Sequence, residues 1–128
     1  MSWFLVLIFF AMCFCHIVDD YYLQGILASM KQKSWWTKQE SYEDKYKNDY
    51  VIALIMHAFS WSFMILIPFL LLGLSPIFLV IALVLNGTIH AFVDDLKANQ
   101  KRINLVQDQS IHIGQIFLTW LIGSLIYV

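Results

Sequence analysis

The sequence predicts an all-α integral membrane protein built as a four-helix bundle. Of its 128 residues, 60% are hydrophobic and 13% are charged, and the mean hydropathy is +0.69. Soluble domains carry roughly 25% charged residues. The apolar residues also gather into four runs, separated by polar or Gly/Pro-containing segments. Composition and pattern together exclude a soluble globular domain and indicate four membrane spans.

The first span is expected over residues 3–24. Its purely apolar part ends at Val18 and reaches only about 24 Å at roughly 1.5 Å per residue, which is short for a bilayer. The acidic turn that follows, with Asp19 and Asp20, is therefore expected within the membrane boundary, and Gly25 offers a break or bend. Because the segment lacks the basic start and cleavage pattern of a signal peptide, we expect it to be retained.

The second and third spans, expected over residues 50–72 and 76–97, are predicted to form a tight hairpin. Gly73 suits the end of the first of these helices. Ser75 can cap the next helix, and Pro76 fits its first turn.

The fourth span is expected over residues 105–127. Asn104 and Gln107 precede and begin it with the spacing of a capping box. The four spans would form one transmembrane domain over residues 1–128.

The basic residues predict the orientation of the bundle. With four spans, the loops at residues 31–49 and 97–104 lie on the same side, and every basic residue falls in one of them. The positive-inside rule places both loops in the cytoplasm and both termini outside, in a multi-pass protein of the inner (cytoplasmic) membrane. The residues are Lys31, Lys33, Lys38, Lys45 and Lys47, then Lys97, Lys101 and Arg102.

Histidine and aspartate residues recur at one depth in the predicted bundle. Three histidines have an aspartate four residues away, which places both on one helix face. In each pair the aspartate lies on the cytoplasmic side of its histidine. The fourth span runs in the opposite direction to the first and third, so there the aspartate precedes the histidine in the sequence. The histidines lie roughly 10 Å from the cytoplasmic ends of their helices. The pairs are His16 with Asp20, His90 with Asp94, and His112 with Asp108; the fourth histidine, His57, follows Asp49 by eight residues.

This pattern predicts a metal site. Ionisable groups within a bilayer are costly and need partners, and a divalent cation would satisfy carboxylates and neutral imidazoles together. Nitrogen and oxygen ligands suit zinc, manganese or ferrous iron, as one ion or two sharing a water. The open alternatives are His–Asp pairs that only hydrogen-bond one another and, less suited to carboxylates, a bis-histidine haem. The predicted ligands are His16, Asp20, His57, His90, Asp94, Asp108 and His112.

Four segments resemble the motifs of a bacterial and phage membrane family catalogued as domain of unknown function 3307. They are residues 16–24 (HIVDDYYLQ), His57, residues 90–97 (HAFVDDLK) and residues 108–112 (DQSIH). The resemblance covers essentially the whole chain and implies a small helical membrane protein with a polar His/Asp core, without an established activity. Its matching carboxylates are Asp20, Asp94 and Asp108, whereas the charged insert at residues 31–48 looks particular to this chain.

The function expected from these residues is a metal-dependent hydrolase that acts from the cytoplasmic side on a lipid-linked, phosphorylated or otherwise amphipathic small molecule. A metal-bound water would be the nucleophile, and Asp19, Asp49 or Asp95 could accept its proton. Lys97 could contact an anionic headgroup, or merely mark topology or snorkel.

Two other function classes stay open. A proton or divalent-metal transporter or channel could use the same residues, although the almost wholly apolar outer half of each span argues against a through-pathway. A phage-type membrane interaction or immunity protein could hold the cluster as structure alone. Membrane lipid is the expected partner and homo-oligomers are possible, whereas nucleic acid is not expected because acidic residues interleave the basic ones.

Overall fold

The computed structural model describes residues 3–39 and 43–128. Over these residues the chain forms helices joined by turns and short connections, with no strand. Four helical segments are long and apolar enough to cross a membrane, which confirms the all-helical, four-span prediction. They are Trp3–Leu23, Asp44–Leu71, Pro76–Ala98 and Leu105–Tyr127.

The first span changes its helix type where its acidic residues begin. Helix α1 (Trp3–Ile17) passes directly into a π-helix, η1 (Val18–Leu23). The wider π turn, a form often found at functional sites, leaves the consecutive residues Asp19 and Asp20 both buried. Gly25 follows with a φ of +49°, which favours glycine, and the chain turns there as predicted.

Among the described residues, three short helices lie between Leu23 and the long helix that begins at Asp49. They are α2 (Leu27–Met30), α3 (Lys33–Thr37) and η2 (Asp44–Tyr46). The predicted loop over residues 31–49 is therefore partly helical, and its residues 40–42 lie outside the described part of the chain.

A helical hairpin forms the next two spans, α4 (Asp49–Leu71) and α5 (Pro76–Ala98). Gly73 has a φ of +71° between them, and Pro76 stands in the first turn of α5 as predicted. The side chain of Ser75, in contrast, makes no capping hydrogen bond, so that part of the prediction is wrong.

Helix α6 (Leu105–Tyr127) begins with the predicted capping box. The Asn104 side chain accepts a 2.9 Å hydrogen bond from the Gln107 backbone N–H, and the Gln107 side chain accepts one of 3.0 Å from the Asn104 backbone. Both satisfy donors that the first helical turn leaves free.

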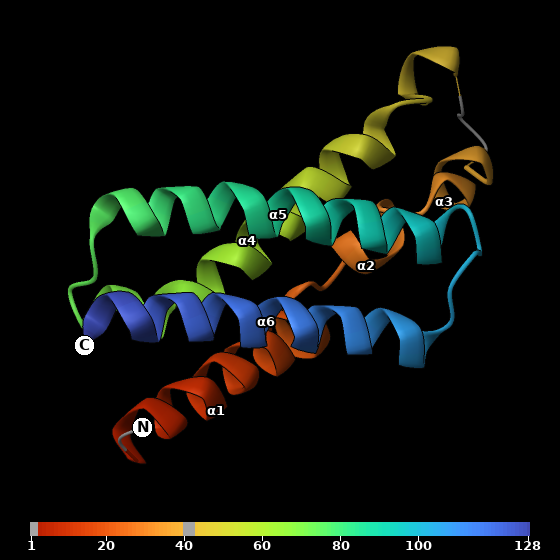
Figure 1. Cartoon of the computed structure of the whole chain (residues 1–128). Helices are drawn as coiled ribbons and strands as arrows, with labels where there is room; N and C mark the ends of the chain where they lie inside the picture. Colours follow the sequence, from red (N-terminus) through yellow and green to blue (C-terminus); the bar gives the residue numbers. More distant parts are fainter. Residues whose placement is uncertain (1–2, 40–42) are drawn as a thin grey trace.

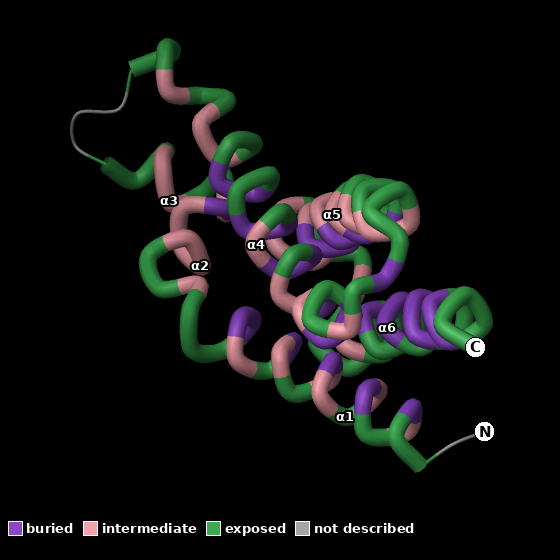
Figure 2. Tube along the Cα trace, turned by 90° about the vertical axis from the view of Figure 1, so that its left-hand side faces the viewer, coloured by how far each residue is buried: buried purple, intermediate pink, exposed green. Residues whose placement is uncertain are grey.

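The bundle has two distinct ends. Both termini and the α4–α5 turn lie at one end, which we call the termini end, whereas α2, α3 and the α5–α6 connection lie at the other, the loop end (Figure 1). Buried residues face inward along the four long helices, and the outward faces are exposed (Figure 2). Many of these exposed residues are large and hydrophobic, as expected of a surface covered by lipid.

An apolar core fills the bundle interior toward the termini end. It consists of ten buried residues whose central members are fully inaccessible. They are Ile8, Met12, Trp61, Ile65, Leu66, Phe69, Leu74, Ala82, Ile116 and Trp120.

Candidate metal centre

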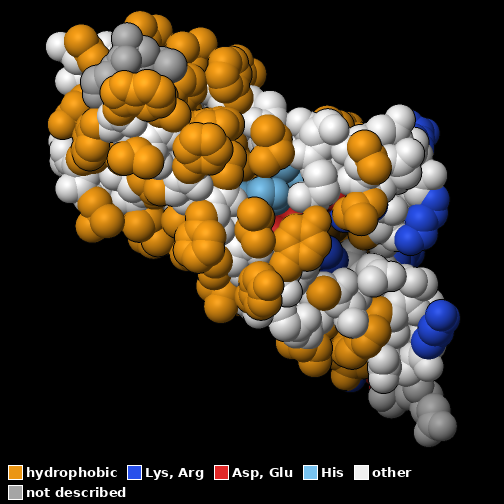
Figure 3. All heavy atoms as spheres, turned by 90° about the horizontal axis from the view of Figure 1, so that it is seen from below, with side chains coloured by type: hydrophobic (Ala, Val, Ile, Leu, Met, Phe, Trp, Pro, Cys, Tyr) orange, Lys and Arg blue, Asp and Glu red, His pale blue; other side chains and the backbone are white. Residues whose placement is uncertain are grey.

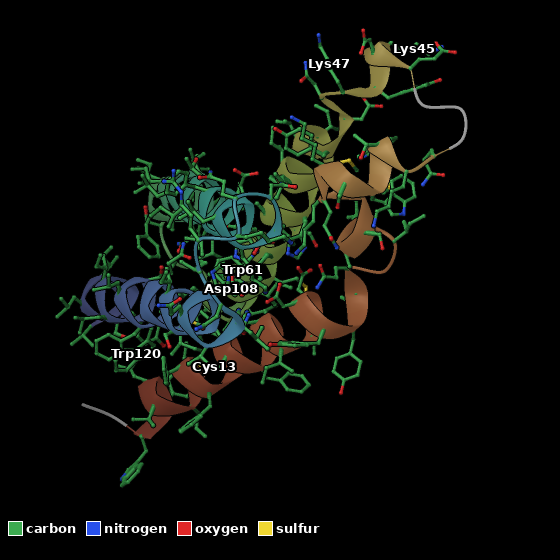
Figure 4. All side chains as sticks on the ribbon, turned by 90° about the vertical axis from the view of Figure 1, so that its right-hand side faces the viewer. Cys13, Lys45, Lys47, Trp61, Asp108 and Trp120 are labelled. Carbon is green, nitrogen blue, oxygen red and sulfur yellow. The ribbon has the colours of Figure 1, made fainter. Side chains whose placement is uncertain are left out.

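Eight buried ionisable side chains meet between the apolar core and the loop end. We call them the His/Asp cluster, and none is more than 6% exposed. Trp61 and Asp108 mark its place near the crossing of the long helices, far from Lys45 and Lys47 (Figure 4). The members are His16, Asp19, Asp20, His57, His90, Asp94, Asp108 and His112.

One set of four potential ligand atoms comes from three helices. His57 Nε2 on α4 lies 3.2 Å from Asp20 Oδ1 of η1, 3.1 Å from His90 Nε2 of α5 and 3.4 Å from Asp94 Oδ2. The distance from His90 Nε2 to Asp94 Oδ2 is 3.8 Å. Ligands about 2.1 Å from a tetrahedral ion lie roughly 3.4 Å apart, so these atoms have the spacing of a coordination shell. We call this set position 1.

A second set adjoins the first through Asp94. His112 Nε2 lies 3.5 Å from Asp94 Oδ1 and 3.4 Å from Asp108 Oδ1. The two oxygens of the Asp94 carboxylate therefore belong to different sets, as in a carboxylate that bridges two ions. We call the second set position 2. Two buried triplets have ligand atoms close enough to one another to hold a metal ion. Asp20, His57 and His90 belong to position 1, whereas His90, Asp94 and His112 span both positions; Asp108 is in neither triplet.

The hydrogen bonds of His112 fix which of its nitrogens is free. Its Nδ1 lies 3.1 Å from Oε1 of Gln115, and the Gln115 amide nitrogen donates to the backbone oxygen of Asn86 at 3.2 Å. An amide oxygen only accepts, so Nδ1 carries the proton and, in the neutral ring, Nε2 presents a lone pair.

Position 2 consequently gathers three acceptor atoms. Neither His112 Nε2 nor Asp108 Oδ1 has a hydrogen-bond partner among the described residues, although both are buried. Buried acceptors that face one another without a donor are unfavourable. A cation placed among them would remove this conflict.

His16 lies beside these positions and is already satisfied by protein groups. Trp61 Nε1 donates to its Nδ1 at 2.7 Å, so its Nε2 carries the proton and donates to Gln109 Oε1 at 3.0 Å. The sequence predicts His16 as a ligand. The structure brings it into the cluster with both ring nitrogens engaged, which is the arrangement of a residue that positions its neighbours.

Gln109 extends this chain of hydrogen bonds to the ligand carboxylates. Its amide nitrogen donates to Asp20 Oδ2 at 3.1 Å and to Asp108 Oδ2 at 3.0 Å. In both residues the other oxygen, Oδ1, is left for position 1 or position 2. Such contacts orient ligand groups and tune metal affinity.

Asp19 lies behind His57 rather than among the ligand atoms. Ser60 donates to its Oδ1 at 2.6 Å, and its Oδ2 lies 3.8 Å from His57 Nδ1, on the side of the ring opposite Nε2. The sequence predicts Asp19 as a proton acceptor in catalysis. Its place in the structure favours orientation of the His57 ring instead.

Two lysines form short ion pairs with the cluster. Lys31 Nζ lies 2.6 Å from Asp94 Oδ2, and Lys97 Nζ lies 2.6 Å from Asp108 Oδ2. Lys97 is among the residues predicted for the site. Lys31 is not, because it is 63 positions from Asp94 and reaches it only through the turn at Gly25.

These pairs leave a defined charge imbalance. Asp19, Asp20, Asp94 and Asp108 contribute −4 when ionised, and the two lysines contribute +2, so the sum is −2 with neutral imidazoles. One divalent cation would neutralise it, and a second would need an anionic ligand to balance its charge. Net charge within a membrane is costly, which favours binding of such an ion.

Two other predicted residues are not brought into the cluster. Asp95 accepts hydrogen bonds from Asn99 Nδ2 at 2.7 Å and from Gln100 Nε2 at 2.8 Å, at the end of α5. Asp49 begins α4, eight residues or roughly 12 Å before His57, and forms no ion pair within the described part of the chain. Their positions do not support the catalytic roles expected of them.

The cluster is reached through a hollow in the hydrophobic surface. Figure 3 shows histidine and acidic side chains at the floor of this hollow, framed by hydrophobic ones. Between η1 and the first turns of α6 lies an open groove of about 580 Å³, which we call the η1–α6 groove. Its lining residues are Tyr21, Leu105, Val106, Gln109, Ser110 and Ile113, of which Gln109 also contacts the cluster.

The chain matches no protein-family model, no curated protein and no solved structure. The resemblance to the domain of unknown function 3307 family therefore stays a prediction. What the chain can do is inferred from the geometry of the His/Asp cluster.

Proposed function

We propose that this chain is a membrane-embedded metal-dependent hydrolase with two adjoining divalent-ion positions bridged by Asp94. The observation that carries the proposal is position 2. There Asp94 Oδ1 and Asp108 Oδ1 lie 3.5 Å and 3.4 Å from His112 Nε2, and neither His112 Nε2 nor Asp108 Oδ1 has a hydrogen-bond partner among the described residues. A doubly protonated His112 would be the metal-free way to satisfy these oxygens, and metal analysis separates the two.

The ligand atoms favour a transition metal. Position 1 offers two imidazole nitrogens and two carboxylate oxygens, and position 2 offers one nitrogen and two oxygens. Such mixed sets suit zinc, manganese or ferrous iron better than calcium, which prefers oxygen ligands alone. We propose one of these three ions.

Bound divalent ions would supply a Lewis acid and a more acidic water. The side chains of the cluster and the lysines paired with it would accept the proton and stabilise the developing charge. Asp20 has one oxygen in position 1 and the other held by Gln109, so it can accept the proton of an attacking water. Lys97, beside Asp108, would balance negative charge that develops on the substrate.

We further propose that the loop end faces the cytoplasm, in the inner membrane. Lys31, Lys97 and the other basic residues all lie in segments at that end, as the positive-inside rule requires. The cluster would then be open to a lipid-linked or phosphorylated amphipathic substrate from the cytoplasmic side.

Transport of protons or divalent ions is the second candidate, and one observation favours it. A buried chain of hydrogen bonds continues from His112 between α5 and α6. It passes through Gln115, Asn86 and Thr119, with Asn86 Nδ2 2.9 Å from Thr119 Oγ1. The apolar core, however, fills the interior toward the termini end with Ile65 and Ile116 at 0% exposure. That packing argues against conduction through one chain.

The test of the proposal is metal-dependent hydrolysis by the purified full chain in lipid nanodiscs. We expect turnover of phosphate-ester lipids with added zinc, manganese or ferrous ion, and a loss of at least about 100-fold in Asp108→Asn. Asp49→Asn is the matched control, since it makes the same change in the same membrane protein roughly 12 Å from His57.

Activity that persists in Asp108→Asn would show that the turnover does not come from this site. Metal-loaded protein without hydrolysis that carries ions into liposomes would instead support transport. Metal-free protein that remains folded would support a cluster with a structural role alone.

A further inference from the structure

We infer that the η1–α6 groove binds a lipid that ends in a phosphate monoester, with its apolar part in the groove and its phosphate beside Lys97 and position 2. The inference rests on the proposed function, because it names the substrate class of that site. Three observations support the inference: the charge of the cluster, the exposure of Lys31 and Lys97, and the residues that line the groove.

The charge of the loaded cluster selects the headgroup. The cluster with its two lysines sums to −2, so two divalent ions would bring it to +2. A phosphate monoester carries about −1.5 to −2 near pH 7 and would restore neutrality. A phosphodiester or a carboxylate carries only about −1 and would leave a positive charge within the membrane.

The two lysines differ in how easily they can meet such a headgroup. The Lys31 side chain is 11% exposed and closes against Asp94, whereas the Lys97 side chain is 35% exposed although its distance to Asp108 is the same 2.6 Å. An ion in position 2 would balance the charge of Asp108. Lys97 is therefore the cation that can turn from Asp108 to an arriving phosphate.

The η1–α6 groove adjoins the His/Asp cluster through Gln109. Leu105, Val106 and Ile113 make its walls apolar, and Val106 is 74% exposed. Gln109 lines the groove and also contacts the cluster, because its amide nitrogen lies 3.0 Å from Asp108 Oδ2. An apolar wall beside a position that would be cationic once loaded with metal matches an amphipathic molecule with an anionic end.

A second groove lacks this connection. It lies between α4 and α5 and has a volume of about 410 Å³. Its lining is almost wholly apolar, and none of its side chains forms a hydrogen bond with the His/Asp cluster, so ordinary lipid chains suffice to fill it. The lining residues are Ile55, Ala58, Phe59, Leu83, Val84, Gly87, Thr88 and Ala91.

The experiment measures binding by the full metal-loaded chain in phosphatidylcholine nanodiscs, with metal content determined on every sample. The probes are a non-hydrolysable phosphonate analogue of phosphatidic acid, the phosphodiester lipid phosphatidylglycerol, and inorganic phosphate. We expect the phosphonate lipid to bind at least about ten-fold more tightly than either of the others, since only it offers both the dianion and the apolar chain.

Two pairs of variants locate the binding. Val106→Trp fills the groove and should weaken the phosphonate lipid at least ten-fold, whereas Leu125→Trp, at an equally exposed residue of α6, should not. Lys97→Gln should weaken the phosphonate lipid and leave phosphatidylglycerol unchanged. Arg102→Gln removes one positive charge from an exposed residue of the same end and should change neither.

Equal binding of the phosphonate lipid and phosphatidylglycerol would overturn the assignment of a monoester. Equal binding of inorganic phosphate, with no effect of Val106→Trp, would overturn the role of the groove. Either result with full metal occupancy would leave the metal centre intact, whereas absence of metal from wild-type protein would overturn the proposed function itself.

Discussion

The two halves of this bundle are held together by different means. Toward the termini end, Phe69, Ile65 and Ile116 interlock at 0% exposure without a charged group. Toward the loop end, carboxylates, imidazoles and lysines meet through contacts of 2.6–3.8 Å. Trp61 belongs to the apolar core and also contacts the cluster. Its ring stacks on that of His90 with 4.1 Å between the ring centroids, and its N–H donates to His16 Nδ1.

This difference follows from the lipid environment. Lipid tails are as apolar as leucine, so transfer out of water does not hold transmembrane helices against one another. Close packing supplies the specificity of one half, and hydrogen bonds and ion pairs supply that of the other. The apolar half should therefore respond to changes of volume, whereas the polar half should respond to changes of charge and to metal.

The largest effect is expected from Lys31→Gln. Asp94, 3% exposed, would lose its cation, and removal of one partner of a buried ion pair costs roughly 3–5 kcal/mol. Unfolding of the variant in detergent with chelator should show this loss, and added divalent ion should recover part of it. Lys33→Gln, at an exposed residue two positions on, is the control. A stability equal to that of wild type would mean that the Lys31–Asp94 pair contributes little.

A smaller effect, confined to the apolar half, is expected from Gly123→Ala. The added Cβ would lie 2.5 Å from a ring carbon of Phe69, which is fully buried, so we expect a cost of roughly 2–3 kcal/mol. Gly114→Ala, also on α6, meets no atom within 4 Å and should be neutral or slightly stabilising. Metal content should stay unchanged in both, and a loss of metal in Gly123→Ala would contradict the separation of the halves.

The smallest effect is expected from Gln109→Leu, which acts on orientation alone. The variant keeps every ligand atom but removes the hydrogen bonds to His16, Asp20 and Asp108. Loss of such contacts lowers metal affinity by about 10–100-fold. Competitive titration with a chromophoric chelator measures the change, with Gln39→Leu at an exposed residue outside the long helices for comparison. An unchanged affinity would show that Gln109 does not position the ligands.

The sequence predicts the parts of this architecture that depend on local periodicity. The four apolar runs, the turns at Gly25 and Gly73, and the capping box of Asn104 and Gln107 follow from residue type and spacing. The placement of His90 with Asp94 and of His112 with Asp108 on shared faces also follows, because four residues make about one helical turn.

What the sequence does not predict depends on contacts between distant elements. From the sequence, Lys31 cannot be distinguished from the other loop lysines, because no neighbouring residue indicates that the chain folds back to Asp94. The engagement of both His16 nitrogens depends on Trp61 and Gln109, which are 45 and 93 positions away. A π turn that buries Asp19 as well as Asp20 has no recognisable signal in residue type.

The two metal positions are tested by the metal content of the full chain, purified without chelator and measured by elemental mass spectrometry together with its His112→Ala variant. We expect about two transition-metal ions per wild-type chain and about one in the variant, since position 1 does not use His112. Wild-type protein that binds no metal when zinc, manganese and ferrous ion are each supplied would rule out both positions, and a stoichiometry that His112→Ala leaves unchanged would rule out position 2.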